Sequence, residues 1–248
     1  MPKSMPHEGL DVYKEALGFV RFITPVVDAV PTYVAARDHL ARATESVVTN
    51  LVKAARLRVT GNGILSLEYS LASCLECAAC IDILRIKSLT NQAAIEEAKE
   101  ILQKIFRMEF GLRRAWCSSL HEEKSNYLVA SETYFSHESL HVYQQALLLL
   151  EKLDATVTRN GRRTNRYARK INQLSTSLVL NIAEGNGRFS QLDQNKFLDI
   201  AEDSGSKLAA YLDLVEATSQ ADMGAARLLL REVMAMLAGM KKYLNSGD

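Results

Sequence analysis

A chain of 248 residues, of which 48% are hydrophobic and 24% charged, is long and apolar enough to fill the cores of two compact domains. This composition excludes an intrinsically disordered protein, in which hydrophobic residues are scarce. The 30 Lys and Arg residues nearly balance the 29 Asp and Glu residues, which excludes a surface that is basic all over. Any binding of nucleic acid must therefore use a local patch.

The N-terminus lacks the apolar core of a signal peptide, and no apolar run approaches the roughly 20 residues of a membrane helix. Four cysteines within helical patterns fit a reducing compartment better than a disulfide framework. We therefore expect a soluble, cytoplasmic protein without a membrane span.

Apolar residues recur with helical spacing through most of the chain, and no strand-length run alternates apolar with polar residues. Pro31 and the stretch Thr60–Gly63 interrupt this pattern, while Asn91 and Ser190 stand where helix caps belong. The predicted helices run roughly over 8–29, 32–58, 64–87, 92–117, 138–158, 163–184, 191–219 and 222–244.

The stretch His7–Leu17 returns 130 positions later as His137–Leu147, with seven of eleven residues identical. The repeat predicts an all-α protein of two tandem up-and-down antiparallel four-helix bundles. We place the first bundle at 1–118, a linker rich in charge and serine at 119–136, and the second bundle at 137–248. Residues 8–117 are expected to superpose on 138–244.

A second marker of the repeat is the stretch Ser177–Ser190, whose Ser177 and Asn181 are echoed by Ser46 and Asn50. Gly185 and Gly187 are expected to close the helix with positive φ angles. We expect each Asn to hydrogen-bond a neighbouring helix or loop, and Glu184 to form a surface ion pair with Arg188. The residues singled out here are Ser46, Asn50, Ser177, Asn181, Glu184, Gly185, Gly187, Arg188 and Ser190.

These motifs resemble the four-helix-bundle proteins of the 23S rRNA intervening-sequence and diversity-generating-retroelement accessory type. The resemblance rests on Leu-x-Val-Tyr-x-x-Ala at both starts, on Ser-x-x-x-Asn-Ile-Ala-Glu-Gly-x-Gly-Arg-x-Ser from Ser177, and on Phe197-Leu-x-Ile-Ala-x-x-Ser204. The first copy keeps other parts of the pattern, at His39–Asn50 and at Ser73-x-x-Glu76.

The resemblance implies a non-enzymatic bundle that forms a ring of five in characterised relatives and binds a reverse transcriptase and nucleic acid through a basic surface. This chain differs because it is duplicated and near neutral. Whole chains that each contain two bundles cannot make up a ring of five bundles, because five is odd. We therefore expect a monomer with an internal pseudo-twofold or repeat contact, or a low even-numbered oligomer.

One basic run offers a candidate nucleic-acid surface. At about 100° per residue its cations share one helix face, and apolar residues such as Ile171 and Leu174 share another. This face could follow a phosphate backbone, or it could simply be a solvated helix surface. The candidate residues are Arg159, Arg162, Arg163, Arg166, Arg169 and Lys170.

The run Cys74-Leu-Glu-Cys77-Ala-Ala-Cys80 has the spacing of iron–sulfur ligands, but it lies in the middle of a predicted helix. We interpret these cysteines as core residues, and predict neither a metal nor a cofactor. His7 and His137 are expected to be caps or surface groups.

No arrangement typical of a catalytic site appears in the sequence. Two functional classes remain. The first is a non-catalytic accessory protein that binds RNA or DNA, a reverse transcriptase, or both, through the basic face. The second is a protein-only interaction scaffold.

Overall fold

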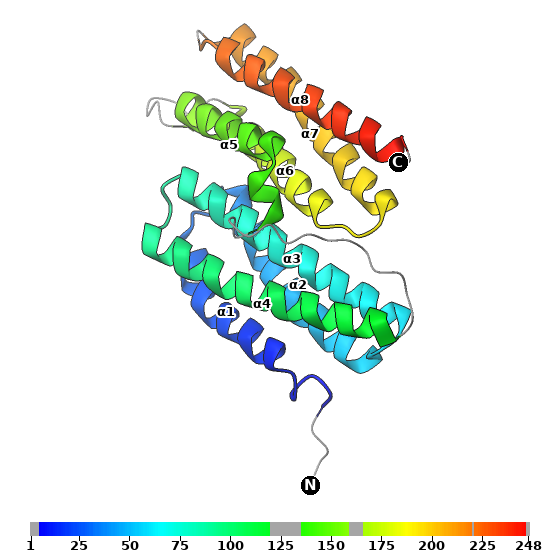
Figure 1. The fold of residues 1–248 in the computed structure, drawn as a ribbon. Helices are drawn as coiled ribbons and strands as arrows, with labels where there is room; N and C mark the ends of the chain where they lie inside the picture. Colours follow the sequence, from blue (N-terminus) through cyan, green and yellow to red (C-terminus); the bar gives the residue numbers. More distant parts are fainter. Residues whose placement is uncertain (1–4, 120–134, 159–165, 220, 247–248) are drawn as a thin grey trace.

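The computed structural model describes residues 5–119, 135–158, 166–219 and 221–246, and these ranges contain helices and no strand (Figure 1). The N-terminal bundle consists of α1 (Asp11–Ala29), α2 (Ala35–Leu57), α3 (Gly61–Ile86) and α4 (Gln92–Ser119). In it, α1 and α3 each pack against both α2 and α4.

The C-terminal bundle repeats this arrangement. It starts with a 3₁₀ turn, η1 (Ser136–Ser139), and with α5 (His141–Leu153), which ends in a π-helical turn, η2 (Asp154–Thr158). The bundle continues with α6 (Ala168–Asn186), α7 (Gln191–Thr218) and α8 (Gly224–Asn245). Here α5 and α7 each pack against both α6 and α8, which confirms the predicted pair of four-helix bundles.

The helix caps follow from local sequence. The backbone N–H of Ala94 donates to Asn91 Oδ1 over 2.8 Å, and that of Asp193 donates to Ser190 Oγ over 3.0 Å, as predicted. Thr60 caps α3 by accepting from Gly63 N, so Gly61–Gly63 open this helix and do not interrupt it. Gly63 is needed there because a Cβ would lie 2.0 Å from the carbonyl oxygen of Arg58.

The central helix of the fold is α3, which is apolar and buried on nearly all sides. We expected no apolar stretch of membrane-spanning length, but by length and composition alone α3 could cross a membrane. Of its most apolar 18 residues, however, 78% are buried inside the protein. Its burial has a simple cause: α2 and α4 cover one side, and α5 and α6 of the other bundle cover another. Cys74, Cys77 and Cys80 are free thiols buried in this helix, as predicted.

Equivalent hydrogen bonds mark the two bundles at positions 131 residues apart. Asn50 Nδ2 donates to the carbonyl oxygen of Ser46 over 2.9 Å, and the hydroxyl of Ser73 on α3 donates to Ser46 Oγ over 2.7 Å. In the C-terminal bundle, Asn181 Nδ2 donates to the carbonyl oxygen of Ser177 over 2.7 Å, and Ser177 Oγ lies 2.9 Å from Ser204 Oγ on α7. The expectation that the asparagines reach a neighbouring helix is wrong: the serines do so.

The two bundles pack directly against each other. The N-terminal bundle contributes mainly α3, with α2 and α4, and the C-terminal bundle contributes η1, α5 and α6. Although α2 and α6 are counterparts, α3 contacts α5 and α6 and, among the described residues, its counterpart α7 contacts neither α1 nor α2, so the contact is a repeat contact and not a pseudo-twofold one. Most of the predicted linker, 120–134, lies outside the described residues. Its end is anchored, because the ring of Phe135 packs edge-on against Phe106 of α4 at 5.6 Å.

Candidate functional site

The predicted basic face is only partly within the described residues. Arg159, Arg162 and Arg163 lie outside them, and α6 begins at Ala168 rather than near residue 163. Arg166, Arg169 and Lys170 are exposed at the start of this helix, and within the described ranges none of the three pairs with a carboxylate. Cations in the first turn of a helix oppose its dipole, so this placement costs stability unless an anion is near.

The glycines at the end of α6 lie at the contact between the bundles. Gly187 has φ −86°, so the predicted positive φ is wrong. A Cβ on Gly187 would lie 2.0 Å from Leu75 Cδ1 of α3, and a Cβ on Gly185 would lie 3.3 Å from Phe197 Cβ of α7. Both glycines therefore allow close packing of α6 against its neighbours.

Arg188 and Glu184 form the predicted ion pair, but not at the surface. Their side chains are only 11% and 19% exposed, and the guanidinium of Arg188 lies 4.3 Å from the ring centroid of Phe197 and 5.5 Å from that of Tyr69 on α3. Burial raises the pKa of Glu184 to about 7, and the nearby Glu76 adds to this, while Arg188 opposes it. The Glu-Gly-x-Gly-Arg motif is thus part of the contact between the bundles.

We expect Gly187→Val to lower the free energy of unfolding by about 1–3 kcal/mol, because the new side chain overpacks Leu75. Urea denaturation measures this effect. Gly111→Ala in α4, where the added Cβ would have no neighbour within 4 Å among the described residues, is the control and should be neutral or stabilising by up to about 1 kcal/mol. A Gly187→Ala/Leu75→Ala double variant that loses the full sum of the two single losses would contradict the contact.

A buried polar cluster joins the bundles on the other side of α3. Lys99 Nζ on α4 donates to Asp82 Oδ1 of α3 over 2.5 Å and to Glu138 Oε1 of η1 over 2.6 Å. The hydroxyl of Tyr143 on α5 donates to Asp82 Oδ2 over 2.9 Å. We call these four residues the Lys99 cluster. Burial, followed by the charge of Asp82, raises the pKa of Tyr143, so its hydroxyl stays protonated as a donor.

His137 lies beside this cluster and is fully buried, so its predicted surface position is wrong. Its ring packs edge-on against that of Tyr143 at 4.7 Å between centroids, and among the described residues neither ring nitrogen has a hydrogen-bond partner. Burial, with a smaller contribution from the positive charge of Lys99, lowers the pKa of His137 to about 3. The imidazole is therefore neutral at physiological pH.

The comparison with known protein families bears on the C-terminal bundle. Residues 138–239 match the family described as 23S rRNA-intervening sequence protein. The C-terminal bundle is therefore similar to this family. The matched range begins at Glu138 of the Lys99 cluster, and covers α5, α6, α7 and most of α8. No curated protein and no solved structure matches the chain.

Among the described residues, Asp82, His137 and Glu138 form a group that could hold a metal ion, since their ligand atoms lie within 4.8 Å of one another. An imidazole nitrogen and two carboxylates would suit Zn²⁺. The ammonium of Lys99, however, already bridges the two carboxylates, and so occupies the place of a cation.

A second buried carboxyl, that of Glu109, lies inside the N-terminal bundle. Its Oε1 is 2.5 Å from Ser70 Oγ, which lies 3.0 Å from the carbonyl oxygen of Val47. One hydroxyl proton cannot serve both acceptors, and burial raises the pKa of Glu109 to about 8. A protonated Glu109 that donates to Ser70, which in turn donates to Val47, satisfies all three groups.

The Lys99 cluster and Glu109 were missed by sequence reasoning. Isolated charged residues on helices look like solvated positions when only the sequence is known. One signal was available, because Glu138 and Tyr143 recur as Glu8 and Tyr13 in the repeat. The basic face was found by its pattern of charges.

Proposed function

We propose that the protein is a tandem duplication of one bundle that acts as a non-catalytic, RNA-associated accessory protein. The observation that supports this most is the group of three exposed cations, Arg166, Arg169 and Lys170, at the start of α6. The helix dipole and these side chains together favour an anion at this point, as a phosphate backbone would supply.

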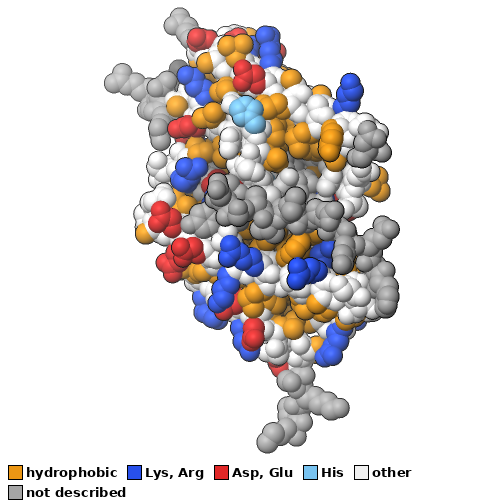
Figure 2. All heavy atoms as spheres, viewed as in Figure 1, with side chains coloured by type: hydrophobic (Ala, Val, Ile, Leu, Met, Phe, Trp, Pro, Cys, Tyr) orange, Lys and Arg blue, Asp and Glu red, His pale blue; other side chains and the backbone are white. Residues whose placement is uncertain are grey.

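Three further observations support the proposal. The matched family is named for an rRNA intervening sequence, which makes RNA the first ligand class to test. Basic and acidic side chains lie next to each other over the face seen in Figure 2, which fits a local rather than a global basic surface. Glu109, His137 and Tyr143, whose pKa values burial shifts, are fully enclosed, so no substrate reaches them in this conformation.

Gel-shift titration with structured RNA and duplex DNA at about 50 and 200 mM salt tests this function. Arg166→Glu/Arg169→Glu should weaken binding at least about tenfold. The slope of log K against log salt concentration should become shallower by the amount that corresponds to about two lost phosphate contacts. Arg107→Glu/Arg114→Glu, which reverses two exposed charges on α4, is the matched control. Absence of binding at low salt, or equal binding by both double variants, would refute the proposal.

The alternative is a protein-only scaffold, which is favoured by the apolar groove between α1 and α2. This groove has a volume of about 360 Å³ and is open at the surface. A reverse transcriptase is the partner that the family resemblance implies, and co-purification with such an enzyme tests this part of the proposal. Co-purification that survives Arg166→Glu/Arg169→Glu and nuclease treatment would favour the scaffold.

A further inference from the structure

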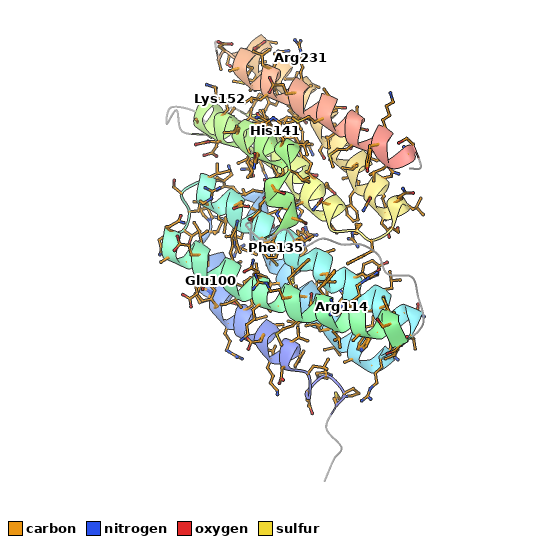
Figure 3. The ribbon with its side chains drawn as sticks, viewed as in Figure 1. Glu100, Arg114, Phe135, His141, Lys152 and Arg231 are labelled. Carbon is orange, nitrogen blue, oxygen red and sulfur yellow. The ribbon has the colours of Figure 1, made fainter. Side chains whose placement is uncertain are left out.

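The contact between the bundles has two complementary sides. One is a groove on α3 and α4 that presents Asp82, Lys99 and Phe106; we call it the acceptor groove. The other is the segment from Phe135 to Tyr143, which inserts Phe135, Glu138 and the Tyr143 hydroxyl into that groove. We call this segment the docking turn. Figure 3 shows Phe135 at the level where the two bundles meet.

The docking turn occurs a second time, at the N-terminus. Met5, His7, Glu8 and Tyr13 lie 130 positions before Phe135, His137, Glu138 and Tyr143. The two turns share the same backbone hydrogen bonds. Glu8 N donates to the carbonyl oxygen of Met5 over 3.0 Å, and Glu138 N donates to that of Phe135 over the same distance. Likewise, Leu10 N donates to the carbonyl oxygen of His7, and Leu140 N to that of His137. The His7 and Tyr13 rings meet edge-on at 4.7 Å, the same distance as His137 and Tyr143.

This N-terminal turn is exposed where its counterpart is buried. Met5 is 62% exposed, although its counterpart Phe135 is 3% exposed. Glu8 is also exposed. The N-terminal turn thus has the same conformation as the docking turn, but it does not insert into an acceptor groove in the described part of this chain.

The acceptor groove also occurs a second time, between α7 and α8. Asp213 of α7 lies 131 positions after Asp82 of α3 and is its counterpart. The buried positions of α8 lie 128 residues after those of α4, so Arg227 and Met234 are the counterparts of Lys99 and Phe106. Arg227 pairs with Asp213 as Lys99 pairs with Asp82. This groove is open, with a volume of about 330 Å³, and Asp213 is 63% exposed compared with 4% for Asp82.

A second pair of surfaces supports the same correspondence. The α1–α2 groove includes Val20, Ile23 and Val27, whose counterparts Leu150, Leu153 and Val157 line the space between α5 and α6. That space is nearly closed, at about 10 Å³, because the end of α3 covers it with Lys87, which donates to Asp154 over 2.5 Å. The α1–α2 groove is therefore the uncovered counterpart of a surface that a bundle covers inside the chain.

We propose that a second copy of this chain docks head to tail on the first, with its N-terminal docking turn in the α7–α8 groove. Met5 would contact Met234, Glu8 would pair with Arg227, and Tyr13 would donate to Asp213, as their counterparts do inside the chain. Part of the α1–α2 groove would be covered by the end of α7, as the end of α3 covers α5 and α6. Such a heterologous contact generates rings or filaments.

The contact between chains should be weaker than the contact within one. Glu216 stands in the position of Arg85, and Ser206 in that of the buried Leu75, so the second groove is more acidic and less apolar. Arg231, in the position of Gln103, offsets part of this charge (Figure 3). Assembly is therefore expected to depend on concentration, and Glu216→Arg is expected to strengthen it.

Sedimentation velocity from low micromolar to submillimolar concentration tests this inference on the full chain. The wild type should rise from 27.6 kDa to at least twice that mass. Glu8→Arg and Arg227→Glu should each remain monomeric alone, because residues 8 and 227 of neighbouring copies then carry like charges. An equal mixture should assemble, because residue 8 of each variant then meets a residue 227 of opposite charge on the other variant. Glu100→Arg and Arg114→Glu on α4 are the matched controls (Figure 3).

Met5→Asp adds a variant that leaves α7 and α8 untouched, so a loss of assembly cannot be ascribed to misfolding of the groove. A wild type that stays at 27.6 kDa throughout, or a mixture of Glu8→Arg and Arg227→Glu that stays monomeric, would overturn the proposal. Assembly of either charge variant alone would do the same. The result does not depend on nucleic acid, which is absent from the experiment.

Discussion

Lys99→Met is expected to lower the free energy of unfolding by about 3–5 kcal/mol. Removal of the ammonium leaves Asp82 and Glu138 facing each other, and their side chains are only 4% and 15% exposed. A buried carboxylate that loses its partner keeps its desolvation penalty without compensation. Arg85, 3.8 Å from Asp82, compensates only in part because it is half exposed. Urea denaturation followed by circular dichroism measures the loss.

The matched control is Lys104→Met on the same helix. Lys104 pairs with Glu15 over 2.6 Å at an exposed position, where such a pair contributes under about 1 kcal/mol. A triple variant, Asp82→Asn/Lys99→Met/Glu138→Gln, should recover part of the stability because it removes both unpaired charges. Equal losses for Lys99→Met and Lys104→Met would show that the Lys99 cluster does not join the bundles.

Glu109→Gln is expected to remove a large pH dependence of stability. The pKa of Glu109 is about 8 in the folded protein and 4.5 in a solvated chain. Between these values the folded state binds one more proton than the unfolded state, so stability falls as pH rises. The slope is about 1.4 kcal/mol per pH unit, with a total of roughly 5 kcal/mol over the about 3.5 units between the two pKa values. The amide of Gln cannot ionise, and it can still donate to Ser70.

The experiment compares free energies of unfolding of the variant and the wild type from pH 5 to 9. Their difference should be small at the acidic end, where the wild-type carboxyl is protonated, and should favour Glu109→Gln by several kcal/mol near and above pH 8. Glu100→Gln, exposed on the same helix, should leave the slope unchanged. A difference that is constant across this range would mean that Glu109 is not protonated in the folded protein.

The sequence by itself determined the all-helical fold, the order of the helices and the caps at Asn91 and Ser190. Helical periodicity and caps such as Asn91 and Ser190 depend on residues within a few positions of each other, so they can be found without tertiary structure. Burial of Cys74, Cys77 and Cys80 was predictable for the same reason, since they lie in an apolar helical pattern. The repeat added the correspondence of the two halves.

Only the tertiary structure decided what the central motif and the isolated polar residues contact. Gly187 looked like a helix stop, and its contact with Leu75 depends on packing between segments more than one hundred positions apart. His137, Lys99 and Glu109 had the pattern of solvated helix positions, and they are buried because a second bundle or a neighbouring helix covers them. Local patterns specify which face of a helix is apolar, but the surface that meets a given polar side chain is fixed only when the bundles pack.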